Sequence, residues 1–159
     1  MIRLTPARST PELTATAALF RAYAKSLNIE LDVDLAPQGF QKELDALPGP
    51  YAPPLGELLL AKTGDHVLGC IALKPLEPPR VAEIKRLYVR DQARGRGLGR
   101  RLVEGMIEIA AERGYSEIKL DTLPQMQAAS ALYRSMGFTD IAPYGSHPYP
   151  GLVTLGKKL

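Results

Sequence analysis

Apolar residues in the N-terminal part of the chain follow first a strand pattern and then a helical one. Residues 2–6 are typical of a short strand. Thr10 is in position to cap the helix that follows, and Pro11 suits its first turn. We expect this helix to end at Asn28 and to bury the apolar positions that recur at helical spacing, namely Leu13, Ala17, Phe20, Ala24 and Leu27.

The middle of the chain changes from helical to extended patterning. Phe40, Leu44 and Leu47 predict a short helix over 37–47, and a proline-rich loop follows it. The segments 57–62 and 66–74 are separated by a tight turn and read as an antiparallel hairpin. A further strand is expected over 81–89, where apolar and polar residues alternate imperfectly.

The C-terminal half holds the clearest helix. Apolar residues recur on one face over 98–113, and Gly114 is in position to end that helix. Because strands are expected at 81–89 and 116–122, the unit reads as strand, helix, strand with a right-handed parallel crossover. A last helix over 125–136 and a last strand over 152–157 complete the pattern, which shows no repeat or linker.

Length and composition favour one enzyme-sized domain over 1–159. The chain has 159 residues, of which 45% are hydrophobic, enough for one core. Its net charge of +3 is too small to argue for nucleic acid, although the basic cluster at 94–101 suits an anionic ligand such as phosphate. Cys70, the single cysteine, lies in an apolar run and is expected to be a buried hydrophobe. Without a leader segment or a membrane-length apolar run, a cytoplasmic protein is the simplest interpretation.

A glycine-rich turn between the strand at 81–89 and the helix at 98–113 is the main chemical signal. Unpaired amides and the positive end of the helix meet there, and glycines allow close approach of a pyrophosphate. A Walker loop would need Gly-Lys followed by Ser or Thr, and a dinucleotide fingerprint would need glycine at position 94. A tight turn with solvated arginines remains the structural alternative. The candidate anion-binding residues are Arg94, Gly95, Arg96, Gly97, Leu98, Gly99 and Arg100.

Three linked motifs resemble the core of the GNAT acetyltransferase superfamily in order and spacing. They are the runs at 82–89 (AEIKRLYV), 94–102 (RGRGLGRRL) and 131–138 (ALYRSMGF). The resemblance implies an α/β (α+β) fold with a mixed central sheet of about six to seven strands and four helices. It also implies acetyl-CoA as co-substrate, with no metal, and transfer of the acetyl group to a primary amine.

The resemblance assigns roles to backbone and side chains. The backbone of Leu87, Tyr88 and Val89 would pair with the pantetheine arm, while the amides of 95–100 would hold the pyrophosphate. Tyr133 falls where a tyrosine commonly protonates the departing CoA thiolate. Its structural alternative is a ring that simply packs against the sheet.

Glu83, on the strand that lies next to the acyl site in similar proteins, is the best candidate for the general base, acting directly or through water. A charged strand residue is also often solvent-facing, so that alternative stays open. His147 ranks behind Glu83, because a loop histidine is usually only exposed. In many similar proteins an asparagine seven residues before this tyrosine contacts the coenzyme. Here Met126 occupies that position, and its neighbours Gln125 and Gln127 are able to substitute for the asparagine.

The acceptor is the least determined feature. In similar enzymes the segments at about 28–36 and 143–151 shape its site. In the first segment, Glu30, Asp32 and Asp34 can attract a cationic amine or be merely solvated. In the second, Tyr144 and Tyr149 can form the wall of a small pocket. We expect a small-molecule or peptide amine, no nucleic-acid or membrane partner, and a homodimer on the strength of the resemblance. A non-catalytic acyl-CoA sensor and an RNA-binding domain are the rival functions.

Overall fold

The computed structural model describes residues 1–31, 34–35, 39–77, 79–145, 149 and 151–159. A seven-stranded mixed sheet forms its centre, in the order β1-β2-β3-β4-β5-β7-β6. The strands are β1 (Arg3–Pro6), β2 (Glu57–Thr63), β3 (His66–Leu76), β4 (Val81–Val89), β5 (Glu117–Thr122), β6 (Thr139–Asp140) and β7 (Val153–Lys158). Within the described residues, four α-helices accompany the sheet: α1 (Thr10–Leu31), α2 (Phe40–Asp45), α3 (Leu98–Glu112) and α4 (Gln127–Ser135). The predicted fold class is therefore confirmed.

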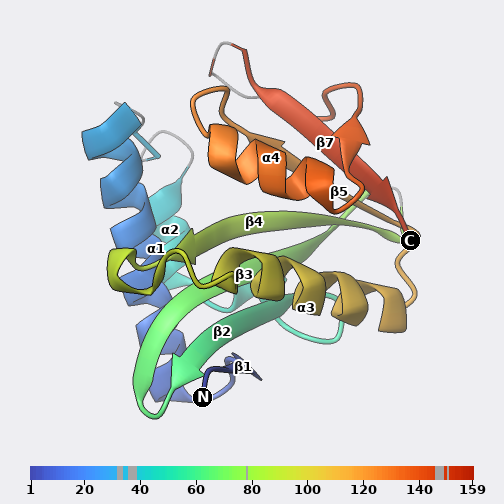
Figure 1. The fold of residues 1–159 in the computed structure, drawn as a ribbon. Coiled ribbons are helices and arrows are strands. Elements are labelled where there is room, and N and C mark those ends of the chain that lie inside the picture. The colour runs from blue at the N-terminus through green and yellow to red at the C-terminus, as the bar shows by residue number, and fades with distance from the viewer. Residues whose placement is uncertain (32–33, 36–38, 78, 146–148, 150) are drawn as a thin grey trace.

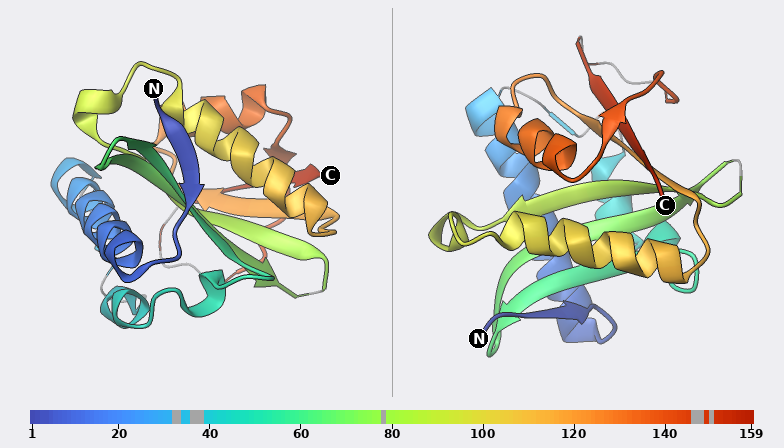
Figure 2. Two further views of the ribbon diagram at one scale, coloured as in Figure 1. Left: turned by 90° about the horizontal axis from the view of Figure 1, so that it is seen from below. Right: turned by 45° about the vertical axis from the view of Figure 1, so that its right-hand side comes forward.

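The helices cover both faces of the sheet (Figure 1, Figure 2). One buried cluster joins α3 and α4 to the sheet and includes Leu102, Met106 and Phe138. A second cluster lies under α1 and α2 and includes Phe20 and Tyr51. Cys70 belongs to this second cluster and is 1% exposed, which confirms the predicted buried thiol. Burial raises the pKa of that thiol to about 12.

The start of α1 differs from the sequence prediction. The cap is Ser9 rather than Thr10, because the Glu12 amide donates to Ser9 Oγ at 3.3 Å. In return, the Ser9 amide donates to Glu12 Oε1 at 2.9 Å, which completes a capping box. The helix also continues beyond the expected end at Asn28, to Leu31.

Other boundaries shift without changing the architecture. The short α2 covers Phe40–Asp45 and so ends two residues before the expected end at 47, while 37 and 38 lie outside the described residues. Helix α4 begins at Gln127, two residues later than expected. The two-residue strand β6 pairs with β7 and was not predicted as a separate element. Among the described residues, no helix is long and apolar enough to cross a membrane.

The parallel pair β4 and β5 opens a gap in the sheet. Their register covers only Val81↔Glu117, Ala82↔Ile118 and Glu83↔Lys119. Beyond Glu83, β4 continues to pair with β3 on its other side, while β5 pairs with β7. The two strands therefore diverge toward their carboxyl ends, which leaves backbone of β4 facing the gap.

A β-bulge lies in the part of β4 that borders this gap. Cys70 pairs with Tyr88 and Ala72 pairs with Lys85, so β4 holds one residue more than β3 between these pairs. Arg86 occupies the bulge and has a φ of 62°. Because of the extra residue, Lys85 and Tyr88 lie three positions apart on the same side of the sheet, which explains the imperfect alternation in the sequence.

Candidate functional site

The glycine-rich turn ends in a helix start that has no side-chain cap. Gly95 and Gly97 adopt φ values of 79° and 72°, a region that glycine enters without strain. Gly97 is the N-cap of α3, and within the described part of the chain this helix start has no side-chain cap hydrogen bond. Leu98 is 2% exposed and anchors the helix start in the core. Free amide donors and the helix dipole therefore meet at an exposed turn, as an anion site requires.

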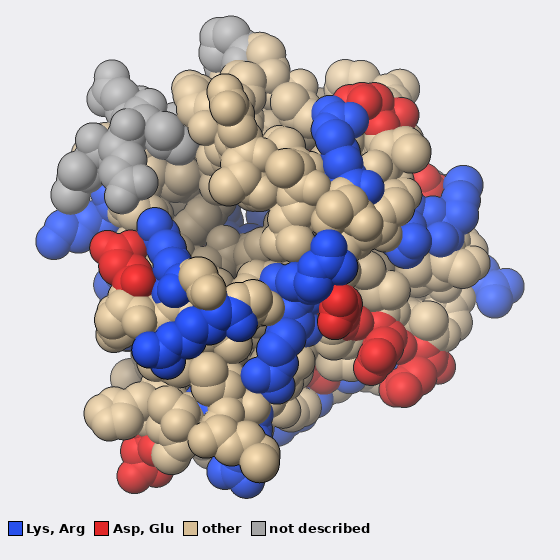
Figure 3. Space-filling view, viewed as in Figure 1, with Lys and Arg blue, Asp and Glu red and all other residues tan. Residues whose placement is uncertain are grey.

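Arginines surround this turn. Arg94 donates from Nε to the Val89 carbonyl at 3.1 Å and lies 3.2 Å from Asp91 Oδ1. Arg100 donates to Ser135 Oγ at 2.8 Å, and Arg96 is exposed. Figure 3 shows Lys and Arg side chains beside a hollow on the face that carries this loop. The surroundings of the free amides are thus positively charged.

A groove of about 420 Å³ runs from the turn between α1, β4 and α4. We refer to it as the Gly99 groove. Its lining includes all three residues expected to bind pantetheine and three residues just before and at the start of α4, namely Leu87, Tyr88, Val89, Gln125, Met126 and Gln127. Gln125 and Gln127 thus lie beside Met126 in the groove.

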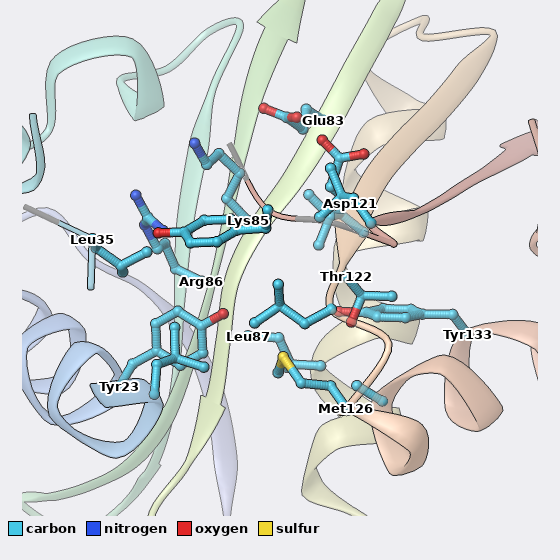
Figure 4. A pocket seen from close by; sticks show the side chains of 16 residues that line it. Tyr23, Leu35, Glu83, Lys85, Arg86, Leu87, Asp121, Thr122, Met126 and Tyr133 are labelled. Atoms are coloured by element: carbon cyan, nitrogen blue, oxygen red, sulfur yellow. The ribbon is translucent and has the colours of Figure 1, made fainter. Parts of the chain in front are cut away.

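A second cavity, of about 110 Å³, adjoins this groove. We refer to it as the Glu83 pocket. The two cavities have Tyr23, Leu27, Leu87, Met126 and Ala129 in common. Figure 4 shows Glu83 and Asp121 at one end of the pocket, with Tyr23 and Met126 at the other. The groove and the pocket therefore meet where β4 and β5 separate.

Glu83 is only 7% exposed, so the solvent-facing alternative does not apply. Its Oε2 accepts a hydrogen bond from the Tyr144 hydroxyl, and its Oε1 lies 3.9 Å from Lys74 Nζ. Burial, followed by the nearby Glu83 carboxylate, raises the pKa of Tyr144, so this hydroxyl stays a donor. The Tyr144 hydroxyl and the Lys74 ammonium thus hold the carboxylate at the pocket wall. A substrate amine can displace these groups or bind the carboxylate beside them.

Asp121 is a pocket residue that the sequence interpretation left out. It follows Leu120 on β5 and accepts a hydrogen bond from Thr154 Oγ1 at 2.8 Å. The next residue, Thr122, is 6% exposed, and its Oγ1 has no hydrogen-bond partner among the described residues. Strand alternation hinted at a polar face on β5, but only the pairing with β4 brings Asp121 near Glu83.

Tyr133 lines the Glu83 pocket and is 5% exposed. Its ring packs edge-on against Phe138, with ring centroids 5.6 Å apart. Burial raises its pKa. The packing alternative and the proton-donor interpretation are compatible, because the ring contacts the core while the residue also lines the cavity.

The acceptor segments named from the sequence are only partly described. Leu35 and Tyr149 line the Glu83 pocket, and the Tyr149 hydroxyl donates to the Asp34 carbonyl at 2.5 Å. His147 and Asp32, like the side chain of Glu30, lie outside the described residues. Among the residues that are described, no group of three or more His, Cys, Asp or Glu side chains could hold a metal ion.

A family model described as "Acetyltransferase (GNAT) family" matches residues 19–138. An uncharacterized N-acetyltransferase of Schizosaccharomyces pombe is 40% identical over 126 residues, covering 78% of this chain and 77% of the relative. An IAA acetyltransferase of Azospirillum brasilense is 33% identical over 160 residues and covers 100% of both chains.

Solved structures show the same fold. The PaiA N-acetyltransferase of Thermoplasma acidophilum, whose structure contains coenzyme A, superimposes with a TM-score of 0.78 at 19% identity. The match covers 100% of this chain and 99% of the other.

Proposed function

The chain belongs to the GNAT acetyltransferase family and is an N-acetyltransferase; on that premise, we propose that it transfers an acetyl group from acetyl-CoA directly to a primary amine bound in the Glu83 pocket. The observation that carries the proposal is the junction of two cavities at the divergence of β4 and β5. One cavity leads to an uncapped helix start, and the other contains a buried carboxylate.

In this proposal the groove binds the coenzyme. The amides at 95–100 hold the pyrophosphate, and Arg94, Arg96 and Arg100 add charge-assisted contacts. The backbone of Leu87–Val89 faces the gap and pairs with the pantetheine arm as an added strand would. This arrangement points the thioester toward the Glu83 pocket. The coenzyme complex of the Thermoplasma acidophilum neighbour is consistent with that use of the fold.

The chemistry follows from the two proposed catalytic residues. Glu83 accepts a proton from the amine, directly or through water, and the nitrogen lone pair forms a bond to the acetyl carbon. When the carbon–sulfur bond breaks, the electron pair leaves on sulfur, and Tyr133 supplies a proton to that thiolate. No covalent enzyme intermediate is required. The small volume of the pocket favours a small-molecule acceptor over a bulky peptide.

Thermal melting with acetyl-CoA, followed by thiol release with a panel of amines, tests the proposal. We expect acetyl-CoA to raise the melting temperature, because a ligand that binds only the folded state stabilises it. Glu83→Gln should keep this stabilisation and lower turnover about 100-fold or more. The matched control is Glu108→Gln, at an exposed position on α3. Stabilisation without thiol release from any amine would favour the sensor function, and no stabilisation would contradict the proposal.

A further inference from the structure

Lys85 places a positive charge in the same pocket as the proposed base. It follows Glu83 by two positions on β4, so the two side chains project from the same face of the strand. Their Cα atoms lie about 6.6 Å apart at the ordinary rise of a strand. Both residues line the Glu83 pocket, and Figure 4 shows them on the same strand beside it. A ligand of a few atoms can reach both side chains.

The charge of Lys85 is poorly compensated. The side chain is half-buried, and within the described residues only the charges of its neighbours act on it, with no hydrogen bond or salt bridge. Burial, with the adjacent positive charge of Arg86, lowers the pKa of Lys85 against the opposing effect of Glu83 and Glu43. A half-buried ammonium without a paired anion costs free energy, which an anionic ligand can recover.

The two carboxylates whose charges act on Lys85 are already engaged. Glu43 forms two hydrogen bonds with Arg86, at 3.0 and 2.9 Å. Glu83 accepts from Tyr144 and lies within 4.0 Å of Lys74. Lys85 is therefore the pocket's cation that remains available to a bound molecule, among the residues that the structure describes.

Two carboxylates, those of Glu83 and Asp121, line the same pocket as Lys85. Both act on the Tyr144 hydroxyl, Glu83 through a hydrogen bond and Asp121 through its charge. An ammonium group is attracted to these carboxylates and an anion to Lys85. The pocket therefore has the charge distribution of a site for a small zwitterion rather than for a simple alkylamine.

We propose that Lys85 binds a carboxylate of the acceptor, so that the acceptor is a small molecule carrying both a primary amine and a carboxylate, as an amino acid does. This inference rests on the proposed function, since it describes the acceptor of that same reaction. The amine lies toward Glu83 and the carboxylate toward Lys85, which orients the nitrogen toward the junction with the Gly99 groove.

Matched pairs of amines test the proposal. Each pair consists of an amino acid and the amine that lacks its carboxylate: glycine and methylamine, L-serine and ethanolamine, L-phenylalanine and phenethylamine, L-lysine and cadaverine. Turnover is followed by thiol release, and binding by the melting temperature in the presence of coenzyme A. In the wild-type protein we expect at least one acid to exceed its partner in kcat/KM by about 10- to 100-fold, as a charge-assisted contact would give.

Variants then assign the preference to Lys85. Lys85→Met should reduce the kcat/KM ratio of acid to amine within the preferred pair to about threefold or less. Lys85→Arg should retain most of the wild-type ratio. Lys42→Met, at an exposed position on α2, should leave the ratio unchanged. Pairs that the wild-type protein binds and acetylates equally would overturn the inference while leaving the proposed function intact. Failure of acetyl-CoA to stabilise the wild-type protein would instead overturn the proposed function itself.

Discussion

The guanidinium of Arg86 and the carboxylate of Glu43 form a two-pronged pair, with Nε and Nη2 of Arg86 donating at 3.0 and 2.9 Å. The pair joins α2 to the bulge of β4. Arg86 also lies over the Phe40 ring, with its guanidinium carbon 5.3 Å from the ring centroid. Its side chain is only 6% exposed, so the bulge conformation is tied to a buried interaction. The helix thereby sets the course of the backbone that borders the groove.

Glu43→Gln is expected to destabilise the fold by about 3–5 kcal/mol, because it leaves the buried Arg86 charge without its partner. It should also weaken acetyl-CoA binding, since Leu87–Val89 follow the bulge directly. Urea unfolding measures the first effect and the ligand-dependent melting shift the second. Glu108→Gln, exposed on α3, serves as the control. A loss of stability below about 1 kcal/mol would contradict the assigned role of the pair.

The same pair gives a pH dependence. Burial alone would raise the pKa of Glu43, but the hydrogen bonds and charge of Arg86 outweigh it and hold the pKa below its ordinary value. Because the pKa of Glu43 is lower in the folded state, its carboxylate stabilises the fold at pH values above the unfolded-state pKa. This stabilisation is lost as the pH falls through the folded-state pKa. In Glu43→Gln, unfolding free energy should therefore fall less steeply below about pH 4 than in the wild-type protein.

The cap of α1 provides a comparison between two adjacent residues. Ser9→Ala removes the acceptor of the Glu12 amide and should cost about 1 kcal/mol, whereas Thr10→Ala should cost only a few tenths. Urea unfolding of both variants measures the difference. Equal losses would show that the capping box of Ser9 and Glu12 does not stabilise the helix start.

Local patterns in the sequence predicted most of the elements, because turns, caps and apolar periodicity act over a few residues. The Ser9 cap could also have been predicted from the sequence, since Glu12 follows three residues later. The bulge at Arg86 could not be predicted in this way, because it depends on a carboxylate 43 positions away in the chain. The same holds for Asp121, which becomes a pocket residue only through the parallel pairing of β4 with β5.

Tyr133→Phe separates packing from proton transfer. The ring contact with Phe138 is preserved, so stability should change by less than about 1 kcal/mol, while turnover should fall at least about tenfold if the hydroxyl protonates the thiolate. Burial raises the pKa of Tyr133, so the hydroxyl stays protonated throughout the neutral range. Any alkaline limb of the wild-type pH–rate profile below pH 9 should therefore persist in the variant. Unchanged turnover would leave Tyr133 with the packing role alone.

Gly97 and Gly114 form a matched pair for testing the anion site. Their φ values are 72° and 88°, and an added Cβ at either would meet no atom within 4 Å. Alanine at either position should therefore cost a similar conformational strain, about 1–2 kcal/mol. Only Gly97 lies at the start of α3, where the amides would hold the pyrophosphate.

We expect Gly97→Ala to weaken acetyl-CoA binding about tenfold or more and Gly114→Ala to leave it unchanged, although both variants unfold at lower urea concentration. Titration of the coenzyme at a temperature where both are folded gives the comparison. The strain at Gly97 acts on the orientation of the first-turn amides, whereas Gly114 lies beyond the other end of the helix, after Glu112. Equal coenzyme affinity in the two variants would mean that the pyrophosphate is held by the arginine side chains rather than by the helix start.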